Sequence, residues 1–323
     1  MPDITLVLGG GGIKGIAHIG VLHVLEKTGL SIRAIAGTSA GGIVGALYAA
    51  GYKASQIEDL IRNVDQSSLF RRSPDEGPAL LGFSGLVEVL STPLGGLTFA
   101  DLTIPFACTA VDLNTSQEII LSSGNILDAA LATAAVPGVF PAQEIDGHTL
   151  VDGGVLDPVP VALGRWLSPT LPIIAICLSP APEQWQHMPT IQLPKVPVMV
   201  PRPILQRIAQ TRLSQAFQIF IKSMDISARS MAELKLQIDR PDVLIRPDVS
   251  RYAMLDEVAP SDLIRIGEEA TWKALPEIER VLGWRSTIAR RFRRAAAPPG
   301  KILAPTPSKA RSEEHTSELQ SRQ

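Results

Sequence analysis

The chain has 323 residues, of which 45% are hydrophobic and 19% charged, and a formal net charge of −2 at pH 7. This composition excludes a disordered chain and indicates a globular protein with a sizeable core. The near-neutral charge argues against a dedicated nucleic-acid-binding protein, which usually carries a basic excess. Both cysteines, Cys108 and Cys177, lie in apolar segments, so we expect buried free thiols in a reducing compartment.

The first third of the chain alternates short apolar segments with stretches of helical periodicity. Buried strands are expected at 4–8 and 32–36, and helices at 16–27, 40–50 and 55–64. The next segment, 71–96, is rich in Pro, Gly and Ser and has weak periodicity. It predicts a mobile surface segment or lid.

The rest of the chain continues the alternation, with one proline-rich interruption. Strands are expected at 104–111, 118–121, 148–151, 171–178 and 243–246, and helices at 126–135, 204–236 and 261–282, the last capped by Ser261. Seven prolines fall between Pro180 and Pro203, which excludes a central strand or a helix there and indicates a linker or a wrapped arm. The alternation favours an α/β fold with a parallel or mixed sheet covered by helices.

A serine framed by glycines follows the second predicted strand. Gly37-Thr38-Ser39-Ala40-Gly41 has the G-x-S-x-G pattern of a nucleophile elbow, in which a sharp strand-to-helix turn exposes the serine hydroxyl. This pattern predicts a serine acyl hydrolase.

A glycine-rich loop follows the first predicted strand, Gly10-Gly11-Gly12-Ile13-Lys14-Gly15. Its successive N–H groups at the mouth of a helix suit the negative charge of a tetrahedral intermediate. Lys14 either adds positive potential or is simply solvated. The same pattern occurs in dinucleotide sites, but those expect an acidic residue at the end of the second strand. That strand ends in Gly37-Thr38-Ser39 instead, so we expect no nucleotide to bind.

A serine hydroxyl is a weak nucleophile and needs a base. None of the five histidines lies in a sequence context suited to that role; they are His18, His23, His148, His187 and His315. Asp152 is the stronger candidate because it ends a predicted strand and is followed by Gly153 and Gly154, which let another backbone approach closely. An Asp-Gly pair alone more often forms a turn. Its occurrence together with the two other motifs favours Asp152 as the general base.

In order and spacing, segments 10–15, 37–41 and 152–154 resemble the three motifs of patatin-like phospholipases. The resemblance extends to His18 and to Pro137-Gly138-Val139-Phe140-Pro141, and it covers about residues 4–178. It implies Ser39 as nucleophile, Asp152 as base and an oxyanion hole at Gly10, Gly11 and Gly12. The motif residues that it implies as supports are Lys14, Gly15, Gly37, Gly41, Gly153 and Gly154.

The resemblance also implies an architecture and a reaction. The fold would be a three-layer α/β sandwich, with a mostly parallel central sheet and helices on both faces, as in the catalytic domain of cytosolic phospholipase A2. The reaction would be hydrolysis of a lipid or acyl ester, of the phospholipase A or lysophospholipase type. It would proceed through an acyl-enzyme made by a Ser39–Asp152 dyad, with no metal or cofactor.

Two other functions stay open from the sequence. A general α/β-hydrolase esterase would use Ser39 with His187, but that fold places several strands before its elbow and only two fit here. A catalytically weak lipid-binding or regulatory module on the same scaffold is the non-enzyme alternative. A lipid panel assayed with the wild type and Ser39→Ala separates the two classes.

The domain organisation follows from these segments. We expect a patatin-like catalytic core at 1–180, the proline-rich crossing at 181–203, an extension that packs on the core at 204–283 and a basic tail at 284–310. Residues 311–321 match the translation of a common sequencing adapter, so we exclude 311–323 from fold reasoning as an artefact and expect a different natural C-terminus.

The sequence predicts a cytoplasmic protein that can contact the inner face of a membrane. No basic-then-apolar leader precedes Ile4, and no charge-free apolar run of 18 residues occurs. The segment 284–294 contains five arginines among apolar residues. It is either an arm for anionic lipid headgroups or a solvated basic tail, and the two interpretations are about equally supported.

Overall fold

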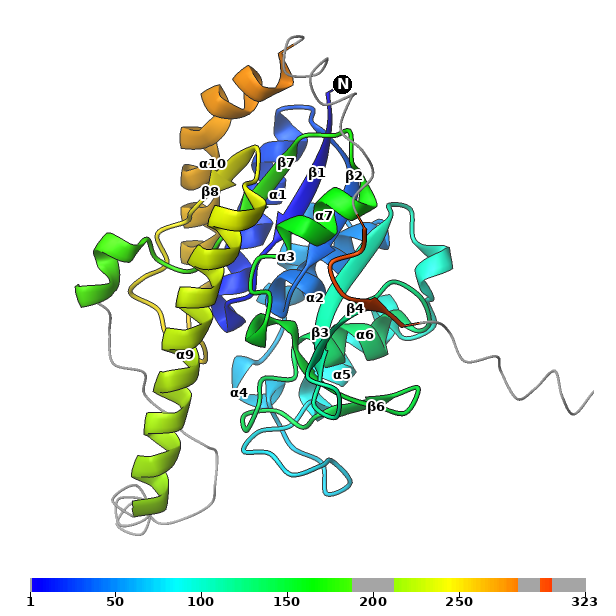
Figure 1. Cartoon of the computed structure of the whole chain (residues 1–323), viewed down its shortest axis with the longest axis vertical. Coiled ribbons are helices and arrows are strands. Elements are labelled where there is room, and N and C mark those ends of the chain that lie inside the picture. The colour runs from blue at the N-terminus through cyan, green and yellow to red at the C-terminus, as the bar shows by residue number, and fades with distance from the viewer. Residues whose placement is uncertain (1, 188–211, 284–296, 304–323) are drawn as a thin grey trace, which may run out of the picture.

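The computed structural model describes residues 2–187, 212–283 and 297–303 (Figure 1). Its described strands form one nine-stranded sheet in the order β5-β6-β3-β2-β1-β7-β8, with β4 beside β3 and β9 beside β4. The strands are β1 (Asp3–Leu8), β2 (Ser31–Gly37), β3 (Phe106–Asp112), β4 (Gln117–Leu121), β5 (Gln143–Ile145), β6 (His148–Asp152), β7 (Ile173–Ile176), β8 (Val243–Ile245) and β9 (Lys301–Ile302). Five of the eight strand pairings are parallel, as expected for a sheet built mainly from strand–helix units.

Helices cover both faces of this sheet, which confirms the three-layer α/β architecture. The α-helices are α1 (Ala17–Lys27), α2 (Ala40–Ala49), α3 (Ala54–Arg62), α4 (Gln66–Leu69), α5 (Ser84–Leu94), α6 (Ile126–Thr133), α7 (Val161–Leu167), α9 (Arg212–Asp239) and α10 (Pro260–Leu282). Short 3₁₀ helices are η1 (Gly12–Ile16), η2 (Phe99–Asp101), η3 (Gly153–Val155) and η4 (Pro182–His187).

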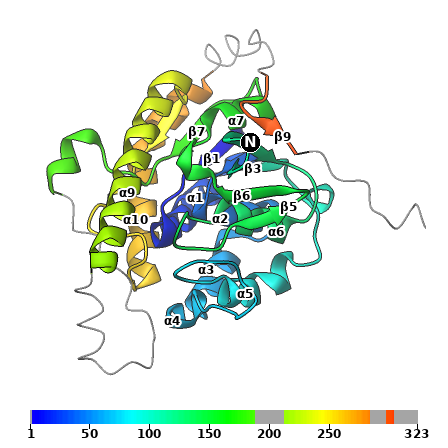
Figure 2. The same ribbon diagram turned by 60° about the horizontal axis from the view of Figure 1, so that its bottom comes forward.

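The alternation of side chains along β1 shows the two cores. Leu6 and Leu8 point to the larger core, which is closed by α1, α2, α3, α5, α6 and α10. Val7 points to the smaller core under α7 and α9. All three side chains are fully buried. Figure 2 shows α3, α4 and α5 grouped on one side of the molecule.

The register of β3 brings two distant chain segments together. On one edge of β3, Cys108 pairs with Gly37 at the end of β2. Two residues further along, Ala110 pairs with Asp152 at the end of β6, which runs antiparallel to β3. The opposite edge of β3 is occupied by β4. The ends of β2 and β6 therefore meet on one edge of β3, and the residues that follow them lie close together.

Two sequence predictions about α-helices need correction. The segment 71–96 is not a lid throughout, because α5 occupies 84–94 and buries Leu86, Leu90 and Leu94 in the larger core. Helix α10 begins at Pro260 after an Ala259 N-cap, so Ser261 does not cap it; proline at the first helical position needs no N–H partner.

Part of the predicted basic tail returns to the sheet. Lys301 and Ile302 pair with Ile119 and Ile120 of β4, and Leu303 is buried. A two-residue strand carries too little pattern to be found from sequence. The segment 284–294 and the excluded C-terminal residues 311–323 lie outside the described residues. Within the described ranges, no helix is both long enough and apolar enough to cross a bilayer.

Candidate active site

Ser39 lies on the sharp turn between β2 and α2, in a conformation rare for a residue with a side chain. Its backbone has φ 56° and ψ −127°, a strained geometry that recurs at functional turns. The flanking glycines make the turn possible. A Cβ at Gly37 would lie 2.6 Å from the Cα of Gly42, and a Cβ at Gly41 would overlap the carbonyl oxygen of Leu8. The predicted elbow therefore forms here because only glycine, which has no Cβ, fits at positions 37 and 41.

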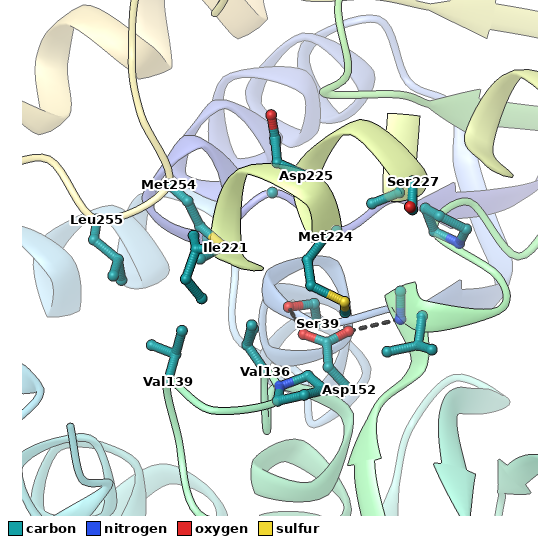
Figure 3. Close-up of a pocket in the computed structure, with 18 of the residues that line it drawn as sticks. Ser39, Val136, Val139, Asp152, Ile221, Met224, Asp225, Ser227, Met254 and Leu255 are labelled. Atoms are coloured by element: carbon teal, nitrogen blue, oxygen red, sulfur yellow. Dashed lines mark hydrogen bonds between the residues drawn. The ribbon is translucent and has the colours of Figure 1, made fainter. Parts of the chain in front are cut away.

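The hydroxyl of Ser39 is hydrogen-bonded to the carboxylate of Asp152. Ser39 Oγ donates to Asp152 Oδ2 over 2.6 Å, and the N–H of Gly154 donates to Asp152 Oδ1 over 2.7 Å. Both side chains are nearly buried, with exposed fractions of 6% and 5%. Figure 3 shows the two side chains next to each other in the pocket. Oδ1 of Asp152 is therefore held by a backbone N–H group, and Oδ2 points toward the Ser39 hydroxyl.

Burial makes Asp152 a better proton acceptor than an ordinary carboxylate. Loss of solvent raises its pKa to about 6, against the hydrogen bonds from Ser39 and Gly154, which lower it. Above that pH the group is ionised and can accept a proton, and its basicity exceeds that of a solvated aspartate. A base tuned toward the working pH is typical of general-base sites.

The glycine loop lines the same pocket, but only part of it is free to bind an oxyanion. The N–H of Gly10 donates to the carbonyl of Pro158 over 2.9 Å. Gly10 is therefore unavailable, and its predicted place in the oxyanion hole is corrected. In the described part of the chain, the N–H groups of Gly11 and Gly12 have no acceptor, and both residues border Ser39 in the pocket.

Neighbouring contacts hold the glycine loop in place. His18 Nε2 lies 2.8 Å from the carbonyl oxygen of Gly9, which fixes the start of the loop and gives this buried histidine a structural role. Gly12 has φ +60° and lies against Met254, so a side chain there would be both strained and obstructed. A Cβ at Gly15 would lie 2.5 Å from that of Ala40, so the loop packs directly on the helix that follows Ser39.

Gly153, predicted as a supporting residue, is also required by close packing. A Cβ there would overlap the hydroxyl and carbonyl of Thr109 on β3. Thr109 Oγ1 in turn lies 2.9 Å from Thr38 Oγ1, next to the nucleophile. The strand β3 thus locks the Asp152 turn against the Ser39 turn.

A threonine from α6 holds the nucleophile turn. The N–H of Ser39 donates to Thr133 Oγ1 over 2.9 Å, and Thr133 is fully buried. We expect Thr133→Val to lower the free energy of unfolding by about 1–3 kcal/mol, because it leaves a buried N–H without an acceptor while keeping the side-chain shape.

Urea denaturation of Thr133→Val beside Thr271→Val checks this expectation. Thr271 is equally buried, but its hydroxyl donates only to the carbonyl of Gly267 within α10. Such a bond within a helix adds little stability, so the control should lose less than about 1 kcal/mol. Equal losses in the two variants would mean that the contact with Ser39 is not special.

Helix α9 forms the wall of the pocket opposite the glycine loop, and the sequence motifs did not reveal it. Phe217, Ile221 and Met224 line the pocket, and the Met224 side chain points toward Ser39 and Asp152 (Figure 3). The predicted helical periodicity of this region identified the helix but could not show which part of the chain it would cover.

The pocket also has a charged wall. Lys14 is buried, and loss of solvent lowers its pKa, an effect that the nearby Asp225 carboxylate opposes. Asp225 forms an ion pair with Arg229 one turn along α9. Lys14 is therefore not a solvated lysine: its buried side chain lines a pocket with a volume of about 200 Å³.

The described histidine side chains have partners other than Ser39. His23 lies between Glu58 and Glu268, and His148 lies 2.8 Å from Asp112. His18 contacts Gly9, as stated above. The side chain of His187 and all of His315 lie outside what the structure describes. The Oγ of Ser39 has a carboxylate partner where an ordinary α/β-hydrolase would have an imidazole.

The family match falls on the part of the chain that carries these motifs. Residues 6–164 match the sequence model of a family described as patatin-like phospholipase. An uncharacterized NTE family protein of Mycobacterium tuberculosis H37Rv is 34% identical over 163 residues, which are 50% of this chain and 45% of that protein. Lysophospholipase NTE1 of Saccharomyces cerevisiae is 32% identical over 163 residues, 49% of this chain and 10% of the yeast protein.

This chain therefore covers less than half the length of either relative. Among solved structures, VipD from Legionella pneumophila superposes with a TM-score of 0.48 at 13% identity, covering 85% of this chain and 66% of that one.

Proposed function

Since the chain belongs to the patatin-like phospholipase family through its residues 6–164, we propose that it is a lipid acyl hydrolase with Ser39 as nucleophile and Asp152 as general base. The single observation that carries the proposal is the 2.6 Å hydrogen bond from Ser39 Oγ to a buried carboxylate, on a strained elbow beside two unpaired glycine N–H groups. The name of the yeast relative, a lysophospholipase, supports a lipid ester as the substrate.

The acylation half of the reaction follows from this geometry. As Ser39 Oγ attacks the ester carbonyl carbon, its proton passes to Asp152 Oδ2. The carbonyl oxygen becomes an oxyanion, which the N–H groups of Gly11 and Gly12 are placed to stabilise. When the C–O bond of the ester breaks, Asp152 returns the proton to the leaving alcohol. The acyl group is then bound to Ser39 as an ester.

Deacylation repeats these steps with water. Asp152 accepts a proton from the attacking water, and the same glycine N–H groups stabilise the second oxyanion. Breakdown of that intermediate returns the proton to Ser39 and releases the fatty acid. The charge that develops on the carbonyl oxygen is stabilised by these backbone groups.

A lipid panel tests the proposal. We expect the wild type to release fatty acid, measured by mass spectrometry, from at least one phospholipid, lysophospholipid or glyceride, and Ser39→Ala to release none above background. Lipid binding without release of fatty acid by either protein would instead favour a non-catalytic lipid-binding module.

The pKa of Asp152 predicts how the rate depends on pH. The base must be ionised, and burial raises its pKa to about 6. We therefore expect kcat/KM to increase about tenfold per pH unit below pH 6 and to level off above pH 7. Initial rates on a neutral short-chain ester between pH 4.5 and 8.5 measure this profile. A midpoint near pH 4 would mean that the essential base is a solvated carboxylate and not Asp152.

We also propose that the protein contacts a lipid surface through α9. This helix lines the pocket with one face, while its other face exposes Ile219, Phe220, Ile226, Leu234 and Ile238. A bilayer on that face would present lipid beside the pocket. We expect the double change Ile219→Ser and Ile226→Ser to reduce sedimentation with phosphatidylcholine vesicles while sparing hydrolysis of a soluble short ester. A preference for anionic lipid, expected from 284–294, stays a prediction.

A further inference from the structure

The turn that follows the proposed base contacts each part of the catalytic site through its backbone. The N–H of Asp157 donates to the carbonyl of Gly153 over 2.8 Å, which closes the turn. The carbonyl of Asp157 accepts the hydroxyl of Thr38, the residue before the nucleophile, over 2.9 Å. The next carbonyl, that of Pro158, accepts the N–H of Gly10. The position of this turn therefore governs how the base, the nucleophile and the glycine loop lie relative to one another.

The side chain of Asp157 fixes this turn to α9. Its Oδ2 atom lies 3.3 Å from Lys235 Nζ of that helix. The Asp157 side chain is fully buried, and its other oxygen has no hydrogen-bond partner in the described part of the chain. A buried carboxyl group is costly to leave without a partner. Among the described contacts of this side chain, the one with Lys235 is therefore what holds the carboxyl group in place.

Further charges surround this ion pair. Glu118 of β4 lies 3.8 Å from Lys235 Nζ, and Asp239 lies one turn further along α9. Burial raises the pKa of Asp157, and the Lys235 ammonium opposes that rise. Loss of solvent lowers the pKa of Lys235, but the three carboxylates raise it by more, so the lysine stays charged. Burial also raises the pKa of Asp239, against the charges of Lys235 and of Arg165 on α7. Lys235 is thus the cation that Asp157, Glu118 and Asp239 share.

We propose that Lys235 and Asp157 are positioning residues for catalysis: their contact holds the turn so that the carboxylate of Asp152 faces Ser39. Neither of the two lines the catalytic pocket, so they act through the turn and not on the substrate. Lys235 also lies outside the residues 6–164 that match the family. This inference rests on the proposed function, because it takes Asp152 as the base.

Three single variants and one double variant test the contact. Lys235→Met and Asp157→Ala both remove it, and we expect each to lower kcat about tenfold or more, because a slightly misplaced catalytic group loses that much. KM should change less than about threefold, since the pocket walls are untouched. The double variant should stay within about threefold of either single variant, because both changes act through one contact. Asp157→Asn should keep kcat within about threefold of the wild type, since the amide oxygen can still accept a hydrogen bond from Lys235.

Fluorophosphonate labelling of Ser39 separates positioning from stability. A partly unfolded variant labels a smaller fraction of its protein at the wild-type rate constant, whereas a misplaced base gives full labelling at a lower rate constant. We expect the second pattern for Lys235→Met and Asp157→Ala, with rate constants about tenfold or more below that of the wild type.

Glu233→Gln is the matched control. Glu233 also joins α9 to the core, through an ion pair with Arg246 over 2.6 Å, and the described bonds of these two residues do not reach the turn. This variant should keep the wild-type rate constant even if its stability falls. Lys235→Gln is a milder second variant for the case that Lys235→Met does not fold, because its side chain stays polar but is too short to keep the contact with Asp157. It should also label fully and slowly.

The outcomes distinguish this inference from the proposed function. If folded Lys235→Met or Lys235→Gln labels at the wild-type rate constant, or if the double variant loses the product of the two single effects, the contact does not position the base and the inference is overturned. Asp157→Asn that is as slow as Asp157→Ala would overturn it as well. In each case, labelling of the wild type on Ser39 would still support the hydrolase. A wild type that is not labelled on Ser39 would overturn both.

Discussion

Replacing Ser39 by alanine is expected to lower kcat for ester hydrolysis by about 10⁴- to 10⁶-fold and to abolish labelling by a fluorophosphonate probe. The substitution removes the nucleophilic oxygen. Among the described side chains that line this pocket, Ser39 is the one whose hydroxyl donates to a carboxylate, so no other activated hydroxyl takes its place. The fold should be retained, because the Ser39 N–H still donates to Thr133 and the Cβ remains in place. Steady-state kinetics on a short ester and probe labelling measure the two effects.

A control is needed because the strained turn could itself be disturbed. Ser227 lines the same pocket from α9, and the described hydrogen bonds of Ser39 Oγ and of the Asp152 carboxylate do not involve it. Ser227→Ala should keep labelling and keep kcat within about threefold. If Ser227→Ala lost both probe labelling and ester hydrolysis while Ser39→Ala kept both, the nucleophile would be Ser227 and not Ser39.

The second large effect concerns the base. Asp152→Asn should lower kcat/KM by about 10²- to 10⁴-fold, because an amide accepts the Gly154 N–H as a carboxylate does but cannot take the proton from Ser39. His187→Ala should lose little. Asp112→Asn is a matched control: Asp112 is also fully buried, but its carboxylate binds His148 and Thr115. A large loss in His187→Ala with activity in Asp152→Asn would instead support a histidine-based triad.

Asp152→Asn should also change the stability of the protein, and here we expect a gain where the catalytic rate is lost. Burial raises the pKa of Asp152 from an ordinary 3.8 to about 6, so the ionised group destabilises the fold by about 3 kcal/mol above pH 6. The penalty decreases as pH falls and disappears below about pH 4, where the group is protonated in both states. Asp152→Asn should therefore unfold at higher urea concentration than the wild type at pH 7.5, and at a similar concentration at pH 4.

Local chemistry explains why the centre of the site could be predicted from the sequence. Ser39 lies two residues after the end of β2, Asp152 ends β6, and glycines follow both; a Cβ at Gly41 or at Gly153 would overlap neighbouring backbone. The strands were visible as apolar runs in a sheet buried on both faces. The sequence did not show that β2 and β6 both pair with the same edge of β3, which brings the ends of these two strands together.

The missed parts depend on long-range packing. Gly10 has the same residue type and motif position as its neighbours, and only the approach of Pro158 shows that its N–H is occupied. Likewise, α5 was hidden by the weak periodicity of 71–96, although its leucines close the larger core.

We propose that Ser39, activated by Asp152, forms the covalent intermediate. The most direct test is to label the wild-type protein with a fluorophosphonate at pH 7.5, digest it, and locate the adduct by peptide mass spectrometry. We expect one adduct, on Ser39, with labelling at least about 100-fold slower in Asp152→Asn. An adduct on another serine, or equally fast labelling of Ser39 in Asp152→Asn, would contradict it.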